Sequence, residues 1–292
     1  MTDGPPSGAL LLDKPRGLTS ARALSKVKRL LPKGTRIGHT GTLDPLASGL
    51  LVLLIGRATR LARYVTPLDK SYTTTARLGV VSTTLDAEGE LSPAEGPIPD
   101  APAIRSELPN FTGNILQVPP MTSALKIDGK RLYDLHRRGI EVEREARPVE
   151  IHAFDLLSTD PANHTATFEI SCSSGTYVRS LISDLAQALG SGAYLTALRR
   201  TRVGDLSVLD ATLPDHLHED SIDNHIIHSI TVLGRLPGVE VPVETRRAVC
   251  SGQKLPRFGV GGSYRVLADG ELLAVYRDEG DLARAEVVLC DP

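Results

Sequence analysis

The sequence contains little cysteine and no long hydrophobic run. Its three cysteines, Cys172, Cys250 and Cys290, lie far apart without C-x-x-C spacing, which argues against a disulfide framework and against a zinc site. The longest apolar run, residues 50–55, is far shorter than the roughly 20 residues of a membrane helix. The N-terminus lacks a charged-then-apolar signal pattern. These absences predict a soluble protein of a reducing cytoplasm that is not exported.

The formal net charge of −2 conceals an uneven distribution. Residues 1–43 hold eight basic side chains against two acids, whereas residues 205–244 hold eight acids against Arg235 alone. A locally basic part can attract a polyanion even when the whole chain is nearly neutral. Such a run is more often a solvated helix face, however, so charge alone does not decide the function.

The length of 292 residues exceeds what one hydrophobic core usually serves and predicts two domains. We place the boundary near residue 235, which gives a domain of residues 1–234 and one of residues 235–292. Periodicity predicts strands over residues 9–13, 50–55, 72–78, 149–157 and 165–172. It predicts helices from Thr19 or Ser20 to residue 31, over residues 131–139 and over residues 178–189, and a surface loop over residues 92–102.

After residue 235 the pattern changes to short strand candidates separated by glycine and proline. Residues 239–243, 264–267, 272–276 and 285–289 are four such segments. This spacing predicts a small β-rich module.

One acid occupies a loop bounded by glycines, in the segment GHTGTLDPLASG of residues 38–49. Because Pro45 follows it, Asp44 is biased towards an extended backbone that presents its side chain instead of using it as a helix cap. The buried strand candidate of residues 50–55 comes next, so the carboxylate is expected at the edge of a cleft. The alternative from the local pattern is that Asp44 closes an Asx-type turn.

This segment resembles the catalytic motif of the TruB-type pseudouridine synthases. The resemblance continues, in the expected order, through LDKP at residues 12–15, KSY at 70–72, ARLG at 76–79, PPMTSALK at 119–126, SGTYVR at 174–179 and LRR at 198–200. It spans roughly residues 9–205. It implies an α+β fold with a mixed, largely antiparallel central sheet flanked by helices and loops, followed by a small PUA-type RNA-binding domain.

The resemblance also implies an activity, the isomerisation of the T-loop uridine of tRNA to pseudouridine. Asp44 matches the family's catalytic aspartate, which acts on either the sugar or the uracil ring. Arg179 matches the arginine that pairs with this aspartate, and we expect the cation to lower the pKa of the acid. Tyr72 matches the tyrosine that stacks on the base and handles the C5 proton. The alternatives are a surface salt bridge for Arg179 and strand packing for Tyr72.

Further residues match substrate contacts of the family. His39 corresponds to a histidine among the rearranged loop bases, and Tyr177 and Leu198 correspond to the lining of the uracil pocket. Lys14 is expected either to contact the phosphate backbone or to steady the Asp44 loop. Residues 124–152 match an insertion that closes on the RNA stem, where the family predicts phosphate contacts for cations that include Lys126, Lys130, Arg131, Arg137 and Arg138.

The resemblance implies no metal and no organic cofactor. His225-x-x-His228 matches no common zinc pattern and is better explained by a solvated connector. The expected partner is the T-arm of tRNA, with no membrane, no obligatory protein partner and a monomeric state. Two other functions stay open: an RNA-binding protein that assists tRNA folding, and the catalytic subunit of a guide-RNA-dependent complex.

Overall fold

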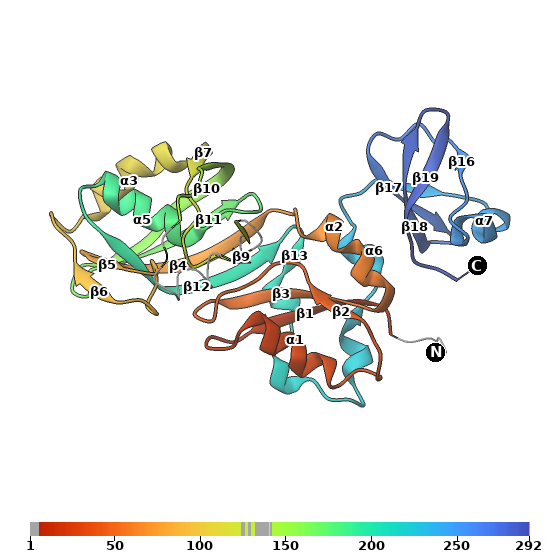
Figure 1. The fold of residues 1–292 in the computed structure, drawn as a ribbon, viewed down its shortest axis with the longest axis horizontal. Helices are drawn as coiled ribbons and strands as arrows, with labels where there is room; N and C mark the ends of the chain where they lie inside the picture. Colours follow the sequence, from red (N-terminus) through yellow and green to blue (C-terminus); the bar gives the residue numbers. More distant parts are fainter. Residues whose placement is uncertain (1–5, 124–125, 128–129, 132–139, 141, 292) are drawn as a thin grey trace.

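The computed structural model describes residues 6–123, 126–127, 130–131, 140 and 142–291, and these residues form an α+β protein with a ten-stranded sheet, a five-stranded sheet and two two-stranded sheets (Figure 1). The strands of the larger part are β1 Gly8–Lys14, β2 Ile37–His39, β3 Ser48–Ile55, β4 Lys70–Leu78, β5 Val80–Ser82, β6 Leu91–Pro93, β7 Gly113–Gln117, β8 Lys126–Ile127, β9 Lys130–Arg131, β10 Arg147–Asp160, β11 Thr165–Cys172, β12 Ala193–Val203, β13 Leu206–Ser207 and β14 Ile226–Ile227. Its helices are α1 Ser20–Lys28, α2 Ala62–Val65, α3 Ala101–Glu107, α5 Val178–Ala188 and α6 Ser229–Val232. The 3₁₀ helices are η1 Gly56–Leu61, η2 Leu108–Phe111, η3 Val208–Asp210, η4 Pro214–His216 and η5 Ile222–His225.

Ten of these strands form one sheet with the order β14-β1-β3-β12-β4-β11-β10-β7, to which β2 and β13 add at the sides. The pairs β5-β6 and β8-β9 form two separate two-stranded sheets. The pairs of the ten-stranded sheet are antiparallel except for the parallel pair of β3 and β12. This agrees with the expected mixed, largely antiparallel sheet. In Figure 1, α3 and α5 lie over one half of the sheet, whereas α1 packs against the other half near β1 and β3.

The predicted strands and helices of this part are largely confirmed. From Gly49 to its last residue β3 is buried, as its continuous apolar run implies. Thr19 caps α1, and its side chain accepts a hydrogen bond from the Arg22 amide. The loop expected over residues 92–102 is partly wrong, because β6 occupies its start and α3 begins at its end. The signal for α3 was present, since Asp100 caps the helix and a proline occupies its first turn. The helix expected over residues 131–139 lies outside the described residues, apart from the strand residue Arg131.

A second, five-stranded sheet forms after residue 237, with the order β15-β17-β18-β19-β16. Its strands are β15 Gly238–Glu240, β16 Leu255–Pro256, β17 Ser263–Ala268, β18 Glu271–Glu279 and β19 Leu282–Val288, with η6 Val243–Thr245 and α7 Arg246–Cys250 beside them. The four expected strands therefore exist, although the first ends at Glu240. The sequence pattern did not predict α7 or β16. We call this part the C-terminal module, and everything before it the body.

The C-terminal module contains a disulfide, which corrects the expectation from the cysteine count. Cys250 at the end of α7 is bonded to Cys290 beyond β19, with 5.3 Å between the two Cα atoms. The two cysteines are 40 positions apart in the sequence and the chain between them folds back on itself, so spacing along the chain could not reveal the pair. The cysteines therefore no longer support a reducing compartment. Cys172 remains a buried free thiol.

An apolar cluster joins the module to the body. Leu272, Val275 and Val287 of the module pack with Leu61 and Val65 of the body. Tyr64 adds a hydrogen bond from its hydroxyl to Glu286, at 2.9 Å. The two parts thus share a continuous contact at η1 and α2. None of the described helices is long and apolar enough to cross a membrane.

Candidate active site

Asp44 lies in the loop between β2 and β3, and the body holds this loop at several points. Ser20 at the start of α1 bonds the amide and the carbonyl of Leu43 through its hydroxyl, at 2.8 and 2.9 Å. At the other end of the loop, Gly49 has a φ of +101°, and a Cβ there would lie 2.2 Å from the Arg200 carbonyl oxygen. Only glycine fits such an approach. The loop is therefore anchored to both α1 and β12.

Two buried cations bind backbone carbonyls of the same loop. Lys14 donates from Nζ to the carbonyls of Ala47 and Leu18, the latter at 2.6 Å. Arg200 on β12 donates from Nε to Leu50 at 2.7 Å and from Nη2 to Gly41 at 3.1 Å. Both side chains donate hydrogen bonds to carbonyls that would otherwise be buried without a partner, at a cost in free energy. Together they fix the backbone on either side of Asp44.

The carboxylate of Asp44 pairs with Arg179, 3.0 Å away, instead of closing an Asx-type turn. Arg179 is in the first turn of α5, and its side chain is only 5% exposed. The same guanidinium contacts the Asp86 carboxylate at 3.2 Å and donates to the carbonyls of Thr84 and Thr122. Arg179 is thus held by the surrounding protein, and it presents one nitrogen to Asp44. The alternative interpretation of Arg179 as part of a surface salt bridge is therefore wrong.

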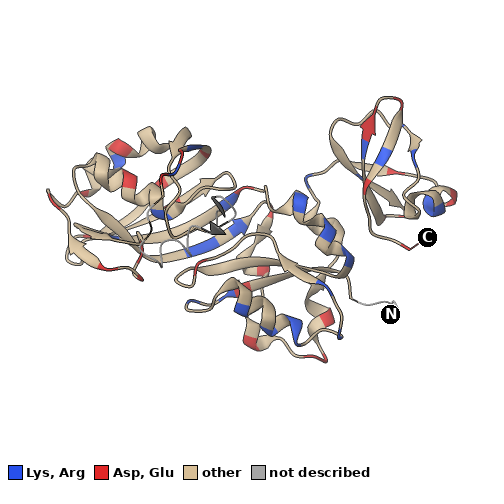
Figure 2. Cartoon of the chain, viewed as in Figure 1, with Lys and Arg blue, Asp and Glu red and all other residues tan. Residues whose placement is uncertain are grey.

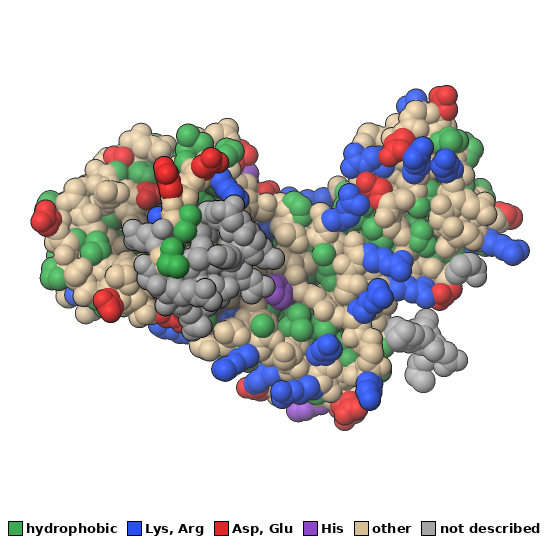
Figure 3. Space-filling view, in the orientation of Figure 1, with side chains coloured by type: hydrophobic (Ala, Val, Ile, Leu, Met, Phe, Trp, Pro, Cys, Tyr) green, Lys and Arg blue, Asp and Glu red, His purple; other side chains and the backbone are tan. Residues whose placement is uncertain are grey.

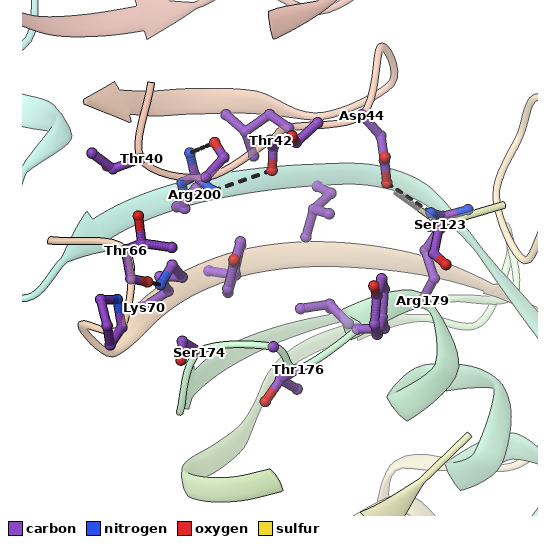
Figure 4. A pocket seen from close by; sticks show the side chains of 18 residues that line it. Thr40, Thr42, Asp44, Thr66, Lys70, Ser123, Ser174, Thr176, Arg179 and Arg200 are labelled. Atoms are coloured by element: carbon purple, nitrogen blue, oxygen red, sulfur yellow. Dashed lines mark hydrogen bonds and ion pairs between the residues drawn. The ribbon is translucent and has the colours of Figure 1, made fainter. Parts of the chain in front are cut away.

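Asp44 and Arg179 line a pocket of about 480 Å³. In Figure 4 the carboxylate of Asp44 points down from its loop towards Arg179, while Lys70 and Thr66 lie at the other end of the pocket. Tyr72 on β4, Leu198 on β12 and Tyr177 just before α5 also line it. The pocket therefore combines large apolar surfaces with one carboxylate and several cations. A site of this kind can hold a flat, partly polar ring against an ionised oxygen.

The surroundings change the pKa of several pocket groups. Burial raises the pKa of Asp44, and the nearby Arg179 offsets this only in part. Our expectation of a lowered pKa was therefore wrong in its net direction, because it considered the cation and not the loss of water. Burial also raises the pKa of Tyr72, whose side chain is almost fully enclosed. Lys70, withdrawn from water and near Arg200, has a pKa lowered to about 8.

The structure brings together Asp44, Tyr72, Arg179, Tyr177 and Leu198 in this one pocket. The remaining predicted residues lie elsewhere or lack described side chains. His39 is on β2 and does not line the described pocket, and burial and Arg200 lower its pKa. Lys14 is fully buried, so its ammonium meets carbonyls and not solvent. Lys126 and Arg131 are paired across β8 and β9, and Arg137 and Arg138 lie outside the described residues.

Three residues of the site were missed by the sequence reasoning. Lys70 and Arg200 stand in the matching blocks at residues 70–72 and 198–200, so position in those blocks was an available signal. Asp86 follows no motif and is found only from its contact with Arg179. The connector histidines have protein partners: His225 Nδ1 lies 3.0 Å from the Thr212 hydroxyl, and His228 Nδ1 accepts from the Ile230 amide.

Comparison with known proteins identifies the family of the chain. Residues 28–178 match the model of the TruB family pseudouridylate synthase N-terminal domain. The chain is 45% identical over 295 aligned positions to tRNA pseudouridine synthase B of Burkholderia mallei, covering 97% of each protein. It is 43% identical to the protein of that name from Cupriavidus metallidurans, covering 94% of this chain and 88% of the relative. The fold is thus that of a pseudouridine synthase. The chain belongs to the TruB family.

Solved structures show the same fold at lower identity. An H/ACA RNP bound to a substrate RNA containing 2′-deoxyuridine contains a chain with a TM-score of 0.72 and 23% identity, covering 96% of this chain and 84% of that one. A Cbf5-Nop10-Gar1 complex contains one with the same TM-score and identity, covering 97% and 85%. At this identity the likeness concerns the fold alone.

Proposed function

We propose that this chain converts the uridine at position 55 in the T loop of elongator and initiator tRNAs to pseudouridine, with Asp44 as the nucleophile. The observation that carries the proposal is the Asp44 carboxylate, held 3.0 Å from the Arg179 guanidinium at the wall of a pocket. The relatives named tRNA pseudouridine synthase B support the choice of substrate.

The chemistry needs little beyond what these residues offer. The bond between N1 and C1′ breaks, the uracil turns while it stays bound, and C5 joins C1′; N1 gains a proton and C5 loses one. A carboxylate can attack as a nucleophile and then leave again. Arg179 holds the negative charge of Asp44 towards the pocket. It also limits the rise of the pKa of Asp44. Arg179 thereby favours the ionised form of Asp44 that a nucleophile requires.

The pocket walls suit a nucleoside swung out of its loop. Base extrusion costs a few kcal/mol, which pocket contacts must offset. Tyr72 would stack on the uracil, while Tyr177 and Leu198 would close its other edges. Because burial raises the pKa of Tyr72, its hydroxyl is protonated near neutral pH. Tyr72 can therefore move the C5 proton only by releasing its own to a neighbour.

The other family matches receive supporting roles in the proposal. His39 would meet RNA bases outside the pocket, and Lys126 and Arg131 would meet phosphates from the insertion of residues 124–152. Lys14 would steady the Asp44 loop, a role that its three carbonyl contacts support. The C-terminal module, with a boundary near residue 235, would act as a PUA-type RNA-binding domain.

The decisive experiment measures pseudouridine in an unmodified tRNA transcript incubated with the purified chain alone. We expect Asp44→Asn to lower turnover by about 10³-fold or more while RNA binding persists, since a nucleophile is removed without a change of shape. Asp155→Asn, which alters an exposed carboxylate on β10, is the matched control and should leave turnover unchanged. Turnover retained by Asp44→Asn would contradict the proposal.

The transcript assay and a complementation test separate the alternatives. Activity only after addition of a guide RNA and accessory proteins would favour a subunit of a complex. Full rescue of a deletion strain by Asp44→Asn would favour a tRNA-folding role. The proposal further includes a monomeric, cytoplasmic enzyme that needs no partner protein, no membrane and no cofactor.

A further inference from the structure

The solvent-facing side of α1 carries a row of cations that the pocket does not use. Arg22, Lys26 and Arg29 follow one another at intervals of four and three residues, so they lie on one side of the helix. The buried Ala23 and Val27 lie on the other side. Figure 2 shows blue segments along α1, and Figure 3 shows Lys and Arg side chains gathered over this part of the body. We call Arg22, Lys26 and Arg29 the α1 basic row.

Most of the positive charge of this row is not neutralised by neighbours. Lys26 pairs with Asp215 at 2.8 Å, but Arg22 and Arg29 form no ion pair with any residue that the structure describes. The exposed Lys28, Lys33 and Arg36 close by add to the same charge and also lack an acidic partner within the described ranges. The region therefore keeps an excess of positive charge facing solvent.

Three arginines of the C-terminal module differ in this respect, although the exposed Arg247 and Arg257 there form no ion pair with a described residue. Arg246 pairs with Glu271 at 2.7 Å, Arg277 pairs with Glu286 at 3.1 Å, and Arg284 pairs with Glu279 at 3.0 Å. Figure 2 shows red and blue segments side by side there. A cation already paired with a carboxylate attracts a polyanion less strongly than one that is not. These three arginines are therefore less suited to binding a polyanion than Arg22 and Arg29.

The α1 basic row is also connected to the pocket. Ser20, the first residue of α1, bonds the backbone of Leu43 next to Asp44. At 1.5 Å per residue, the row from Arg22 to Arg29 extends about 10 Å away from this contact. Neighbouring phosphates of a strand lie a few ångströms apart, so a row of this length can meet more than one of them.

We propose that the α1 basic row binds the phosphate backbone of the RNA whose nucleoside enters the pocket. The inference rests on the proposed function, because a nucleoside held at Asp44 is part of an RNA chain. The rest of this polyanion must run over the surface next to the pocket. Phosphate contacts position an RNA without reading its sequence. The exposed residues of α1 include no aromatic side chain, which does not fit a membrane-surface helix.

The test compares two double variants that remove the same charge. Arg22→Gln/Arg29→Gln alters the row, and Arg77→Gln/Arg105→Gln alters arginines on β4 and α3, outside both the pocket and α1. Equilibrium binding of a full tRNA transcript and of an isolated T-arm stem-loop is measured over a range of salt concentrations in the Asp44→Asn background. The values of kcat and KM are measured with Asp44 intact.

For the row variant we expect binding of full tRNA to weaken by about tenfold at ~0.1 M salt. The slope of log K against log salt should fall by about 1 to 2, since each phosphate contact contributes about 0.7–0.9. We expect KM to rise by a similar factor and kcat to change less than about twofold, because the pocket is untouched. A parallel loss with the stem-loop assigns the contact to the T-arm backbone, and a loss with full tRNA alone assigns it to RNA beyond that arm.

The proposal is overturned if the row variant and the control variant show the same binding, salt slope and KM with both RNAs. The proposal is also overturned if the protein with an intact α1 basic row binds anionic lipid vesicles in preference to tRNA. Failure of the proposed function would look different, since the unaltered chain would then form no pseudouridine although the binding comparison could still be made.

Discussion

The body and the C-terminal module use charged side chains in opposite ways. Among the described residues, the charged side chains that are buried are Lys14, Lys70, Asp86, Arg179 and Arg200, and all of them belong to the body. The module keeps its ion pairs near solvent, as with Arg246 and Glu271, whose side chains are 41% and 50% exposed. The buried charges of the body surround or support the pocket. Charge burial is therefore concentrated where the chemistry is proposed.

This difference has an energetic meaning. Removing a charge from water costs several kcal/mol unless geometry and hydrogen bonds compensate. Surface pairs contribute little, typically about 0–1 kcal/mol. A body that buries five charges in and beside one pocket has its stability tied to that pocket, whereas the module depends on its apolar core and two enclosed tyrosines, Tyr264 and Tyr276. Substitutions in the two regions should therefore differ in their cost.

The largest expected difference concerns Arg179. Replacing it as Arg179→Gln leaves the buried Asp86 without its cation, and we expect the free energy of unfolding to fall by about 3–5 kcal/mol. The acid limb of the pH dependence of kcat/KM should move to higher pH, because Arg179 lowers the pKa of Asp44 against the effect of burial. Urea unfolding and pH profiles measure the two effects.

Arg246→Gln is the matched change in the module, where it breaks the exposed pair with Glu271. It should cost less than about 1 kcal/mol. Equal losses for Arg179→Gln and Arg246→Gln would remove the proposed distinction between the regions.

The second expected difference is a pH dependence of the free energy of unfolding that comes from Lys14. Burial, the dominant influence, lowers its pKa from 10.5 to about 8 in the folded chain. Below pH 8 both states hold the proton, and between about 8 and 10.5 only the unfolded state does. The contribution of Lys14 to stability therefore rises with pH in that window, by up to roughly 3 kcal/mol in all.

Lys14→Met should lack this rise, so the difference in unfolding free energy between the unaltered chain and the variant should grow from pH 8 to pH 10.5. Lys254→Met, which changes an exposed lysine of the module, should run parallel to the unaltered chain. Urea unfolding at several pH values decides between these outcomes. Parallel profiles for Lys14→Met would mean that its ammonium is not desolvated.

Much of the pocket could be predicted from sequence, because its residues stand in short motifs. Asp44, Tyr72, Arg179, Tyr177 and Leu198 lie in separate blocks that the fold brings together. The net direction of the pKa of Asp44 could not be predicted, since burial depends on contacts between distant segments. Lys14 shows the same limit: its pattern allowed two roles, and only the tertiary structure encloses its ammonium.

The fold was predictable where a local pattern carried it and was missed where the contact was long-range. The apolar run of β3 and the cap at Thr19 are local signals. The pairing of Cys250 with Cys290 depends on how α7 and β19 pack together, which no spacing rule contains. Asp86 likewise gains its importance only from its position beside Arg179.

The smallest expected effect lies at the border between the two regions, where the distinction should weaken. Glu286 of the module is only 15% exposed and accepts hydrogen bonds from Tyr64, Ser263 and Arg277. Tyr64→Phe removes one of the three donors, and because the other two remain, we expect a loss of about 1 kcal/mol. Tyr194→Phe is the control. The Tyr194 hydroxyl has no hydrogen-bond partner in the described part of the chain, so its removal should cost less. Urea unfolding compares the two, and an equal cost would mean that the Tyr64 hydroxyl does not help to join module and body.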